Sequence, residues 1–361
     1  GKVLHHMNVQ SGGALMIASA DLLGSTSIAE ATRGLAGGYW NMASRPESRT
    51  LATGGICEDA MTGILAGLSS FGSHLGVGSS YGAFIAPLGH IAARLHAIGN
   101  QARAAVSGAP FTPFVMICGH AGLKTGEDGP THADPQPLQL LQENFPGGTL
   151  ITLTPWDPNE IWPLMTEALD RRPAIIVPFV TRPSETVIDR ELMGLAPADH
   201  ARRGVYRLRA ANRASDGTIV LQESGVAYEF IQGALRLLEQ DGIDLDVYYV
   251  ASAELFDRLM PIEREGIYPE ELAMEAMGIT GFTMPTMYRW IRSDFGRAHS
   301  LHPYRSGKYP GSGAGHAVLT EAELDGGSQH RAILRYVEER RKGQTRKARR
   351  KTTSAPADLR G

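Results

Sequence analysis

The first half of the chain alternates between short apolar runs and longer segments with apolar residues at helical spacing. The apolar runs are continuous and have the length of buried parallel strands: residues 14–18, 114–118, 150–153 and 174–177. The segments with helical spacing lie between these runs: residues 58–71, 84–106 and 159–169. This alternation predicts an α/β domain built on a parallel sheet.

A second series of the same kind follows in the other half of the chain. The predicted elements are, in order, strand 218–221, helix 226–239, strand 245–250, helix 253–259 and helix 321–340. The two series predict the fold class α/β, with two consecutive α/β domains whose sheets are mostly parallel.

The stretch between the two series is polar, rich in Arg and Asp, and without strong periodicity over residues 183–216. We therefore predict a first domain over residues 1–185, a linker over 186–216, a second domain over 217–340 and a basic tail over 341–361. The tail is poor in apolar residues, which predicts disorder.

Composition and charge narrow the class of protein. Hydrophobic residues make up 42% of the 361 residues, which excludes disorder along the whole length. A formal net charge of −3, from 35 basic and 38 acidic residues, indicates no preference of the body for nucleic acid or membranes. No apolar run is long enough to span a membrane.

The two cysteines and the first residues bear on compartment and processing. Cys57 and Cys118 cannot form a disulfide framework, so we expect a reducing compartment and a cytoplasmic protein. The chain begins with Gly1 and has neither an initiator Met nor a signal-peptide pattern. We therefore expect a processed or truncated piece of a longer protein.

The densest group of reactive side chains follows the predicted strand 114–118. Residues 119–132 read GHAGLKTGEDGPTH and contain two histidines and two carboxylates. In open parallel sheets the carboxyl ends of the strands bind ligands, and such side chains are suited to holding and protonating a polyhydroxylated substrate. The alternative is a surface loop whose polar residues cap turns. The spacing matches no zinc pattern, which disfavours a structural metal.

Three segments resemble transketolase, a family of thiamine diphosphate enzymes. Residues 126–132 (GEDGPTH) are similar to the family's signature, and residues 19–22 (SADL) to the start of its pyrimidine-binding domain. Residues 55–61 (GICEDAM) are similar to the segment with its cofactor-activating glutamate. The resemblance covers residues 14–340 and implies a pyrimidine-binding domain followed by a transketolase-like C-terminal domain.

The resemblance implies that the chain contacts the pyrimidine end of thiamine diphosphate. The thiazolium C2 must lose a proton, and a carboxylate hydrogen-bonded to the aminopyrimidine favours the imino tautomer whose nitrogen removes it. Glu58 matches the glutamate with this role, Tyr81 and Phe84 match the aromatic wall, and Asp21 is also implied in cofactor binding. Without the resemblance, Glu58 is a first-turn acid that complements the helix dipole, and Tyr81 and Phe84 are core residues.

The same resemblance assigns residues to the substrate. His120 and His132 would contact substrate hydroxyls and assist proton transfers, and Asp128 would orient the hydroxyl at the ketose C2. Ser25 and Arg182 would hold a sugar phosphate, because a guanidinium forks well onto phosphate. The family's serine–arginine–glutamine is not preserved around this arginine, so an exposed arginine without a substrate is the alternative.

The cofactor's diphosphate and metal are expected elsewhere. Transketolases bind both through a Gly-Asp-Gly motif on a separate N-terminal domain, and no Gly-Asp-Gly occurs in this sequence. We therefore expect no metal ligands in this chain, and Mg²⁺ or Ca²⁺ only through a partner domain or subunit. The implied assembly is a homo- or hetero-oligomer, and this chain alone is expected to be catalytically incomplete.

The hypothesis that follows is the C-terminal half, or a subunit, of a transketolase-like transferase of pentose phosphate metabolism. It would move a two-carbon ketol unit from a ketose phosphate to an aldose phosphate. One alternative is a subunit of a 2-oxo acid dehydrogenase-type thiamine diphosphate enzyme, and another is a non-catalytic binding or regulatory half. For the basic tail, the alternatives are a solvated segment and one that binds nucleic acid or an acidic partner.

Overall fold

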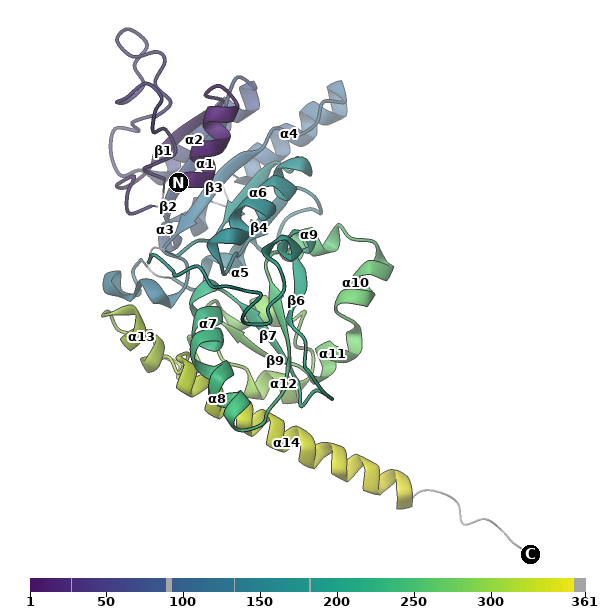
Figure 1. Ribbon diagram of the computed structural model, residues 1–361. Helices are drawn as coiled ribbons and strands as arrows, with labels where there is room; N and C mark the ends of the chain where they lie inside the picture. Colours follow the sequence, from purple (N-terminus) through teal and green to yellow (C-terminus); the bar gives the residue numbers. More distant parts are fainter. Residues whose placement is uncertain (27, 89–92, 133, 182, 354–361) are drawn as a thin grey trace, which may run out of the picture.

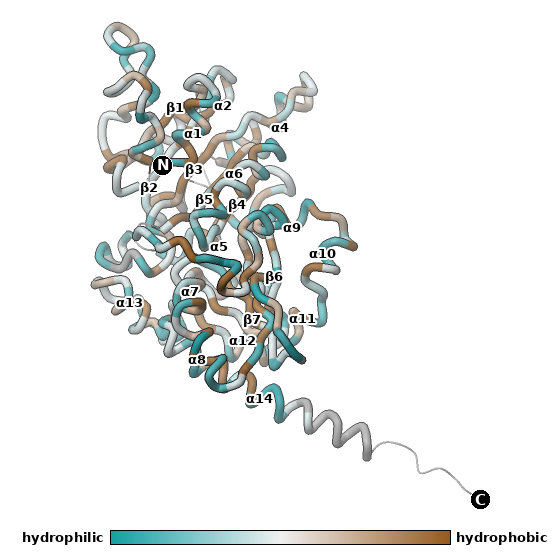
Figure 2. The backbone as a smooth tube through the Cα atoms, viewed as in Figure 1, coloured by the Kyte–Doolittle hydropathy of each residue, from teal (hydrophilic) through white to brown (hydrophobic). Residues whose placement is uncertain are grey.

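The computed structural model describes residues 1–26, 28–88, 93–132, 134–181 and 183–353. The chain forms two sheets with helices packed against them, and the two sheets lie one after the other along the molecule (Figure 1). Strands such as β3 (Phe114–Gly119) and β7 (Thr218–Gln222) lie in hydrophobic parts of the backbone (Figure 2). The architecture confirms the predicted fold class.

The first sheet is parallel throughout and has the strand order β1-β2-β3-β5-β4. Its strands are β1 (Leu15–Ser19), β2 (Leu75–Tyr81), β3 (Phe114–Gly119), β4 (Leu150–Leu153) and β5 (Ile175–Pro178). Its helices are α1 (Lys2–Gln10), α2 (Glu58–Phe71), α3 (Gly82–Leu88), α4 (Arg94–Ser107), α5 (Pro137–Leu141) and α6 (Ile161–Asp170), with the 3₁₀ turns η2 (Leu123–Asp128) and η3 (Pro158–Glu160). The four predicted strands are present, each shifted by one residue at most. The described parts of the segment 84–106 are helical, in α3 and α4, and residues 89–92 between them lie outside the described chain.

Strand β2 is absent from the sequence-based expectation, although it lies second in the sheet. Its sequence, LGVGSSY, interrupts the apolar pattern with two glycines and two serines. Gly76 approaches α2 so closely that a Cβ there would stand 2.2 Å from the carbonyl oxygen of Leu65. Close packing against a helix therefore specifies this strand, and hydrophobic bulk contributes less.

The second sheet has the order β6-β8-β7-β9, in which β6 is antiparallel to β8 and the other pairs are parallel. Its strands are β6 (Val205–Arg209), β7 (Thr218–Gln222), β8 (Asp246–Val250) and β9 (Met277–Thr280). Its helices are α7 (Ser224–Glu229), α8 (Leu235–Gln240), α9 (Ala253–Asp257), α10 (Pro261–Ile267), α11 (Glu270–Glu275), α12 (Asp294–His299), α13 (Gly315–Glu321) and α14 (Gly326–Thr353). The shorter helical turns are η4 (Ala198–Arg203), the π-turn η5 (Phe230–Ala234) between α7 and α8, and η6 (Met284–Met287).

The segment 186–216, predicted as a linker, contains structure of its own. It includes η4 and β6, and β6 pairs with β8 as an edge strand of the second sheet. The second domain's sheet therefore begins before residue 217. The hydrophobic pattern did not predict this strand, because Arg207 and Arg209 interrupt the apolar run. An edge strand needs no continuous apolar run.

The C-terminal segment also differs from expectation over part of its length. Helix α14 packs its first half on the second domain through Ile333, Tyr336 and Val337, and then extends away from the body (Figure 1). It continues to Thr353, so residues 341–353 are helical where the composition predicts disorder. Lys, Arg, Gln and Ala are good helix formers, and propagation from a packed helix removes the cost of nucleation. Residues 354–361 lie outside the described chain.

Candidate active site

The predicted site residues converge at the carboxyl edge of the first sheet, where β1, β2 and β3 end side by side. In the parallel register Ser19 pairs with Ser79, and Tyr81 pairs with Gly119. The residues that follow β1, terminate β2 and follow β3 therefore meet at one edge. This is the edge at which open parallel sheets bind ligands.

Four rings form the centre of this cluster. The Tyr81 ring lies 4.2 Å from the His120 ring and 5.2 Å from the His132 ring, between centroids. The Phe84 ring lies 5.3 Å from His132 and 6.1 Å from Tyr81, both edge to face. Phe84 is 38% exposed whereas Tyr81 is buried, so the cluster presents an aromatic surface to solvent. The alternative of plain core packing therefore fits Tyr81 better than Phe84.

Polar groups surround the Tyr81 and His120 rings. The hydroxyls of Tyr81 and Ser25 are 2.9 Å apart and hydrogen-bonded. Burial raises the pKa of Tyr81, and the nearby Asp21 acts in the same direction. His120 is fully buried, and its Nδ1 lies 3.1 Å from a carboxylate oxygen of Asp128, which is partly exposed. Five predicted residues thus share one network of contacts.

The backbone of the loop holds these side chains in place. His120 has a φ of 56° and Gly122 a φ of 75°, so the chain turns sharply after β3. The Ala121 N–H donates to the Val180 carbonyl at 3.0 Å, which fixes the turn to the segment after β5. Turn η2 follows and ends at Asp128, so that the Asp128 side chain lies next to His120. The polar side chains of this loop thus contact one another and the Tyr81 ring of β2.

Glu58 lies at the same edge of the sheet but against the opposite face. It is the first residue of α2, and its carboxylate accepts a hydrogen bond of 2.7 Å from the Ser80 hydroxyl. Ser80 and Tyr81 are neighbours on β2, so their side chains point to opposite faces. The carboxylate is half-buried and aligned with the N-terminal end of the helix dipole.

Two predicted or missed residues complete the account. Arg182, predicted to hold a phosphate, lies outside the described residues. Ser80 was missed by sequence reasoning, because β2 itself was missed. The serine pair at the end of a Gly-rich strand, directly before Tyr81, is the signal that points to it.

The described residues contain neither a side-chain cluster suited to a metal ion nor a helix suited to crossing a membrane. Among the residues that the structure describes, no cluster of three or more His, Cys, Asp or Glu side chains is placed to hold a metal ion. The helices of the described chain include none with the length and apolar character needed to cross a membrane.

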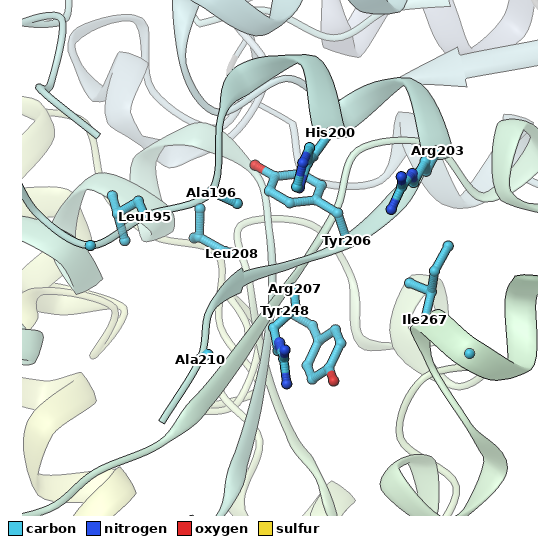
Figure 3. Close-up of a pocket in the computed structure, with 12 residues that line it drawn as sticks. Leu195, Ala196, His200, Arg203, Tyr206, Arg207, Leu208, Ala210, Tyr248 and Ile267 are labelled. Carbon is cyan, nitrogen blue, oxygen red and sulfur yellow. The ribbon is translucent and has the colours of Figure 1, made fainter. Parts of the chain in front are cut away.

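A cavity of about 480 Å³ lies away from this site, in the second domain (Figure 3). Its lining includes His200, Arg203, Tyr206, Arg207, Tyr248 and Ile267. None of the predicted site residues lines it, so it is not part of the cluster at the edge of the first sheet.

Comparison with known proteins places this geometry in a family context. Residues 7–182 match the family model described as transketolase, pyrimidine binding domain. A transketolase of Aquifex aeolicus is 28% identical over 244 residues, which is 66% of this chain and 32% of that protein. A transketolase of Halalkalibacterium halodurans is 29% identical over 164 residues, which is 44% of this chain and 23% of that protein. The matched part thus spans about a third of the length of these relatives, or less.

Solved structures show the same fold over nearly the whole chain. Transketolase from Leishmania mexicana superimposes with a TM-score of 0.73 at 21% identity, covering 94% of this chain and 45% of that one. Transketolase from Pichia stipitis, in complex with sedoheptulose 7-phosphate, superimposes with a TM-score of 0.72 at 19% identity, covering 93% of this chain and 45% of that one.

Proposed function

Because this chain belongs to the transketolase family and contains its pyrimidine-binding domain, we propose that it forms the pyrimidine side of a thiamine diphosphate site. In this proposal the chain acts with a diphosphate-binding domain and transfers a two-carbon ketol unit between sugar phosphates. The chain spans less than half of the solved transketolases, which leaves room for such a domain in the complete assembly.

The observation that carries the proposal is the convergence of Glu58, Tyr81, Phe84, His120 and Asp128 at one sheet edge. The Glu58 carboxylate is half-buried and held by Ser80, which suits a group that must present one oxygen to a heterocycle in fixed orientation. The exposed part of Phe84 offers an aromatic surface for a flat ring to pack against. These residues fit the pyrimidine end of the cofactor.

The chain's own residues then have distinct tasks. Thiamine diphosphate, when bound, supplies the carbon nucleophile that attacks the carbonyl of the ketose. Glu58 holds a proton at the pyrimidine and keeps that ring in its reactive tautomer. Tyr81 and Phe84 orient the ring and exclude water from one side of it. Asp21 contributes to the cofactor side next to the Tyr81 hydroxyl.

The His120 loop would handle the sugar. Asp128, which is partly exposed, holds the orientation of the buried His120 through their 3.1 Å contact, and the pair would assist proton transfers at a substrate hydroxyl. His132 lies beside Phe84 and Tyr81 and would contact a second hydroxyl. Ser25, together with Arg182, would hold the phosphate end. The substrates proposed are ketose phosphates such as the sedoheptulose 7-phosphate bound by the Pichia stipitis enzyme.

In this proposal the chain binds only the pyrimidine end of the cofactor, which has a direct consequence for its affinity. With no Gly-Asp-Gly sequence in the chain, the divalent metal and the diphosphate would be bound by the partner domain. We expect the isolated chain to bind thiamine diphosphate and Mg²⁺ weakly, with no saturation at micromolar cofactor in calorimetry.

The proposed activity is tested with the full chain and a transketolase diphosphate-binding domain supplied as a separate protein. Release of aldose phosphate from a ketose phosphate donor is measured with thiamine diphosphate and Mg²⁺. Glu58→Gln should preserve folding and lower kcat by roughly 10²- to 10⁴-fold, because an acid–base group is lost. Asp59→Asn is the matched control: it removes a neighbouring exposed charge from the same helical turn and should leave kcat unchanged.

Two results would overturn the proposal. Turnover of Glu58→Gln within threefold of the unmodified chain would remove Glu58 from the chemistry. Decarboxylation of a 2-oxo acid by the same assembly, without ketol transfer, would replace the proposed reaction.

A further inference from the structure

Glu223 is a buried carboxylate that the proposed reaction does not use. It follows β7 and caps α7, where its two oxygens accept hydrogen bonds from the Gly225 and Val226 N–H groups at 2.6 and 3.0 Å. Burial raises its pKa to about 7, although these bonds oppose the rise. Its φ of 96° lies in the left-handed region, which is strained for a residue with a side chain.

Capping a helix requires neither a buried carboxylate nor a strained backbone conformation. Helix α9 follows the neighbouring strand β8 in the same way, and Ser252 caps it with its hydroxyl from ordinary extended backbone, with a φ of −168°. Strained backbone conformations persist where the surrounding structure imposes them, often at functional sites. The surroundings of Glu223 therefore indicate what else the residue does.

The Glu223 side chain is enclosed by three glycines, one of which belongs to the loop of the candidate active site. A Cβ on Gly122 would stand 2.5 Å from a carboxylate oxygen of Glu223, and a Cβ on Gly281 would stand 2.2 Å from the other. Gly122 comes two residues after His120 on the same sharp turn. The carboxylate of the second domain thus packs directly on the backbone that carries His120.

The charges around Glu223 extend this contact to turn η2. Lys124 attracts the Glu223 carboxylate and lowers its pKa against the effect of burial, whereas Glu185 raises it. Lys124 also forms an ion pair of 2.6 Å with Glu185 and lies over the Tyr228 ring. The backbone N–H of Glu223 donates to the Tyr249 hydroxyl, which fixes the capping residue to β8.

The far end of the loop is also covered by the second domain. A Cβ on Gly315 would stand 2.2 Å from the Lys124 carbonyl oxygen, and a Cβ on Gly129 would stand 2.9 Å from the Ser312 Cβ. Residues 119–129 are therefore packed between the first sheet and two segments of the second domain. A displacement of the segment with Glu223, or of the segment with Ser312 and Gly315, would therefore displace the loop as well.

We propose that Glu223 is a positioning residue for the candidate active site. Through its contact with Gly122 it fixes the turn 119–122 and so places His120 against Tyr81 and Asp128. The second domain thereby acquires a role in the site without contributing a group that touches substrate. This proposal extends the proposed function to a residue of the second domain. Only its expected effect on kcat rests on the proposed function.

The test compares Glu223→Gln with Glu254→Gln in the full chain. Glutamine replaces one of the two carboxylate oxygens by an NH2 donor. In the observed geometry, where each oxygen accepts from a different N–H, one of these N–H groups would face a donor, and the charge near Lys124 is lost. Glu254 is a matched control because burial raises its pKa to about 6 and it also joins the two domains, through the Thr152 hydroxyl and the Glu143 N–H at 2.7 and 2.9 Å. It has no contact with the His120 loop among those in the described structure.

Amide hydrogen exchange, corrected for global stability, is the first measurement. In Glu223→Gln the amides of residues 120–124 should exchange at least about tenfold faster than in the unmodified chain, because the loop opens locally. In Glu254→Gln they should be unchanged. Faster exchange confined to Gly225 and Val226 would overturn the proposal, since Glu223 would then only cap α7.

The imidazole of His120 gives a second, independent signal. Its ring lies 4.2 Å from that of Tyr81, so its proton resonances depend strongly on the relative position of the rings. His120→Gln assigns these resonances by their loss. They should shift in Glu223→Gln and stay in place in Glu254→Gln, and unchanged resonances in both would also contradict the proposal.

Two additions keep the outcome decisive. Glu223→Gly removes the carboxylate but relieves the strained φ, so it gives a folded variant with the same expected loop opening if Glu223→Gln does not fold. In the assembled enzyme, Glu223→Gln should lower kcat with little change in cofactor affinity. If even the unmodified assembly shows no ketol transfer, the proposed function fails, while exchange and resonance shifts still decide the role of Glu223.

Discussion

At the scale of single residues, the site depends on hydroxyl groups that position charged or aromatic neighbours. Ser80 donates to Glu58 and Ser25 shares a hydrogen bond with Tyr81. A carboxylate with a fixed donor on one side presents its other oxygen in a defined direction, which a mobile first-turn glutamate does not. The proposed role of Glu58 should therefore depend on Ser80, a residue that the hydrophobic pattern did not identify.

Ser80→Ala tests this dependence. A hydrogen bond to a charged group contributes about 1.5–3 kcal/mol, so loss of the donor should lower kcat in the assembled enzyme by roughly 10-fold or more. Ser69→Ala is the control, because Ser69 is buried between the same helix and strand but accepts from the Gly76 N–H at the other end of β2. Its variant should lose stability and keep kcat. Equal kcat losses in both variants would indicate a general effect on packing.

At the scale of elements, the pairing of α2 with β2 brings Glu58 to Ser80. Helix α2 begins with Glu58 and ends at Phe71, and the capping residue Gly72 that follows has a left-handed conformation, with a φ of 88°. Its buried residues Met61 and Leu65 pack on β2 where Gly76 and Gly78 leave room for them. Two glycines in a strand thus set the distance between helix and sheet, and with it the position of the Glu58 carboxylate.

Gly76→Ala and Gly63→Ala should have opposite effects. At Gly76 a Cβ would stand 2.2 Å from the Leu65 carbonyl oxygen, so α2 must move and stability should fall by about 1–3 kcal/mol. Gly63 lies on the exposed side of the same helix with nothing within 4 Å of an added Cβ. Alanine there should stabilise by about 0.5–1 kcal/mol. Urea unfolding of the three proteins measures both, and a neutral Gly76→Ala would show that the helix position is adjustable.

At the scale of the whole molecule, a buried ionic network joins the domains. Arg190, in the segment between them, donates to Asp157 and to Glu160, both at 2.8 Å. Tyr206 of β6 donates to Glu160 and accepts from the Trp156 indole at 2.9 Å. First domain, connecting segment and second sheet thus share one set of contacts. This network holds the second domain where Glu223 can reach the His120 loop.

The network should give the protein a defined pH dependence. Burial raises the pKa of Glu160 from 4.5 to about 6 and outweighs the attraction of Arg190. Because the folded state then binds the proton more tightly than the unfolded state, the stabilisation from this group is complete below pH 4.5 and is lost as the pH rises through 6. The shift corresponds to about 2 kcal/mol.

Glu160→Gln isolates this contribution. The stability of the unmodified chain relative to this variant should fall by about 2 kcal/mol between pH 4.5 and pH 7, as measured by urea unfolding at several pH values. Glu191→Gln, which removes an exposed carboxylate beside Arg190, should show no such trend. A constant or growing difference for Glu160→Gln would mean that attraction by Arg190 exceeds the effect of burial.

The sequence by itself determined the features that depend on local pattern. The four apolar strands of the first sheet, helix α2 from Glu58 to Phe71, and the loop with His120, Asp128 and His132 follow from continuous hydrophobicity, helical spacing and a distinctive motif. The family resemblance rests on the same short segments. Burial of apolar surface dominates folding, so elements that carry it are visible along the chain.

The tertiary structure alone decided the features that depend on close approach between distant segments. Strand β2 and its serine at residue 80, the edge strand β6 and the strained Glu223 have no apolar signature. Strand β2 forms where Gly76 allows α2 to approach closely. Strand β6 forms by pairing with β8, and the conformation of Glu223 is set by the packing of the first domain's loop on its carboxylate. Such contacts join residues far apart in sequence, and their energies appear only when the chain is folded.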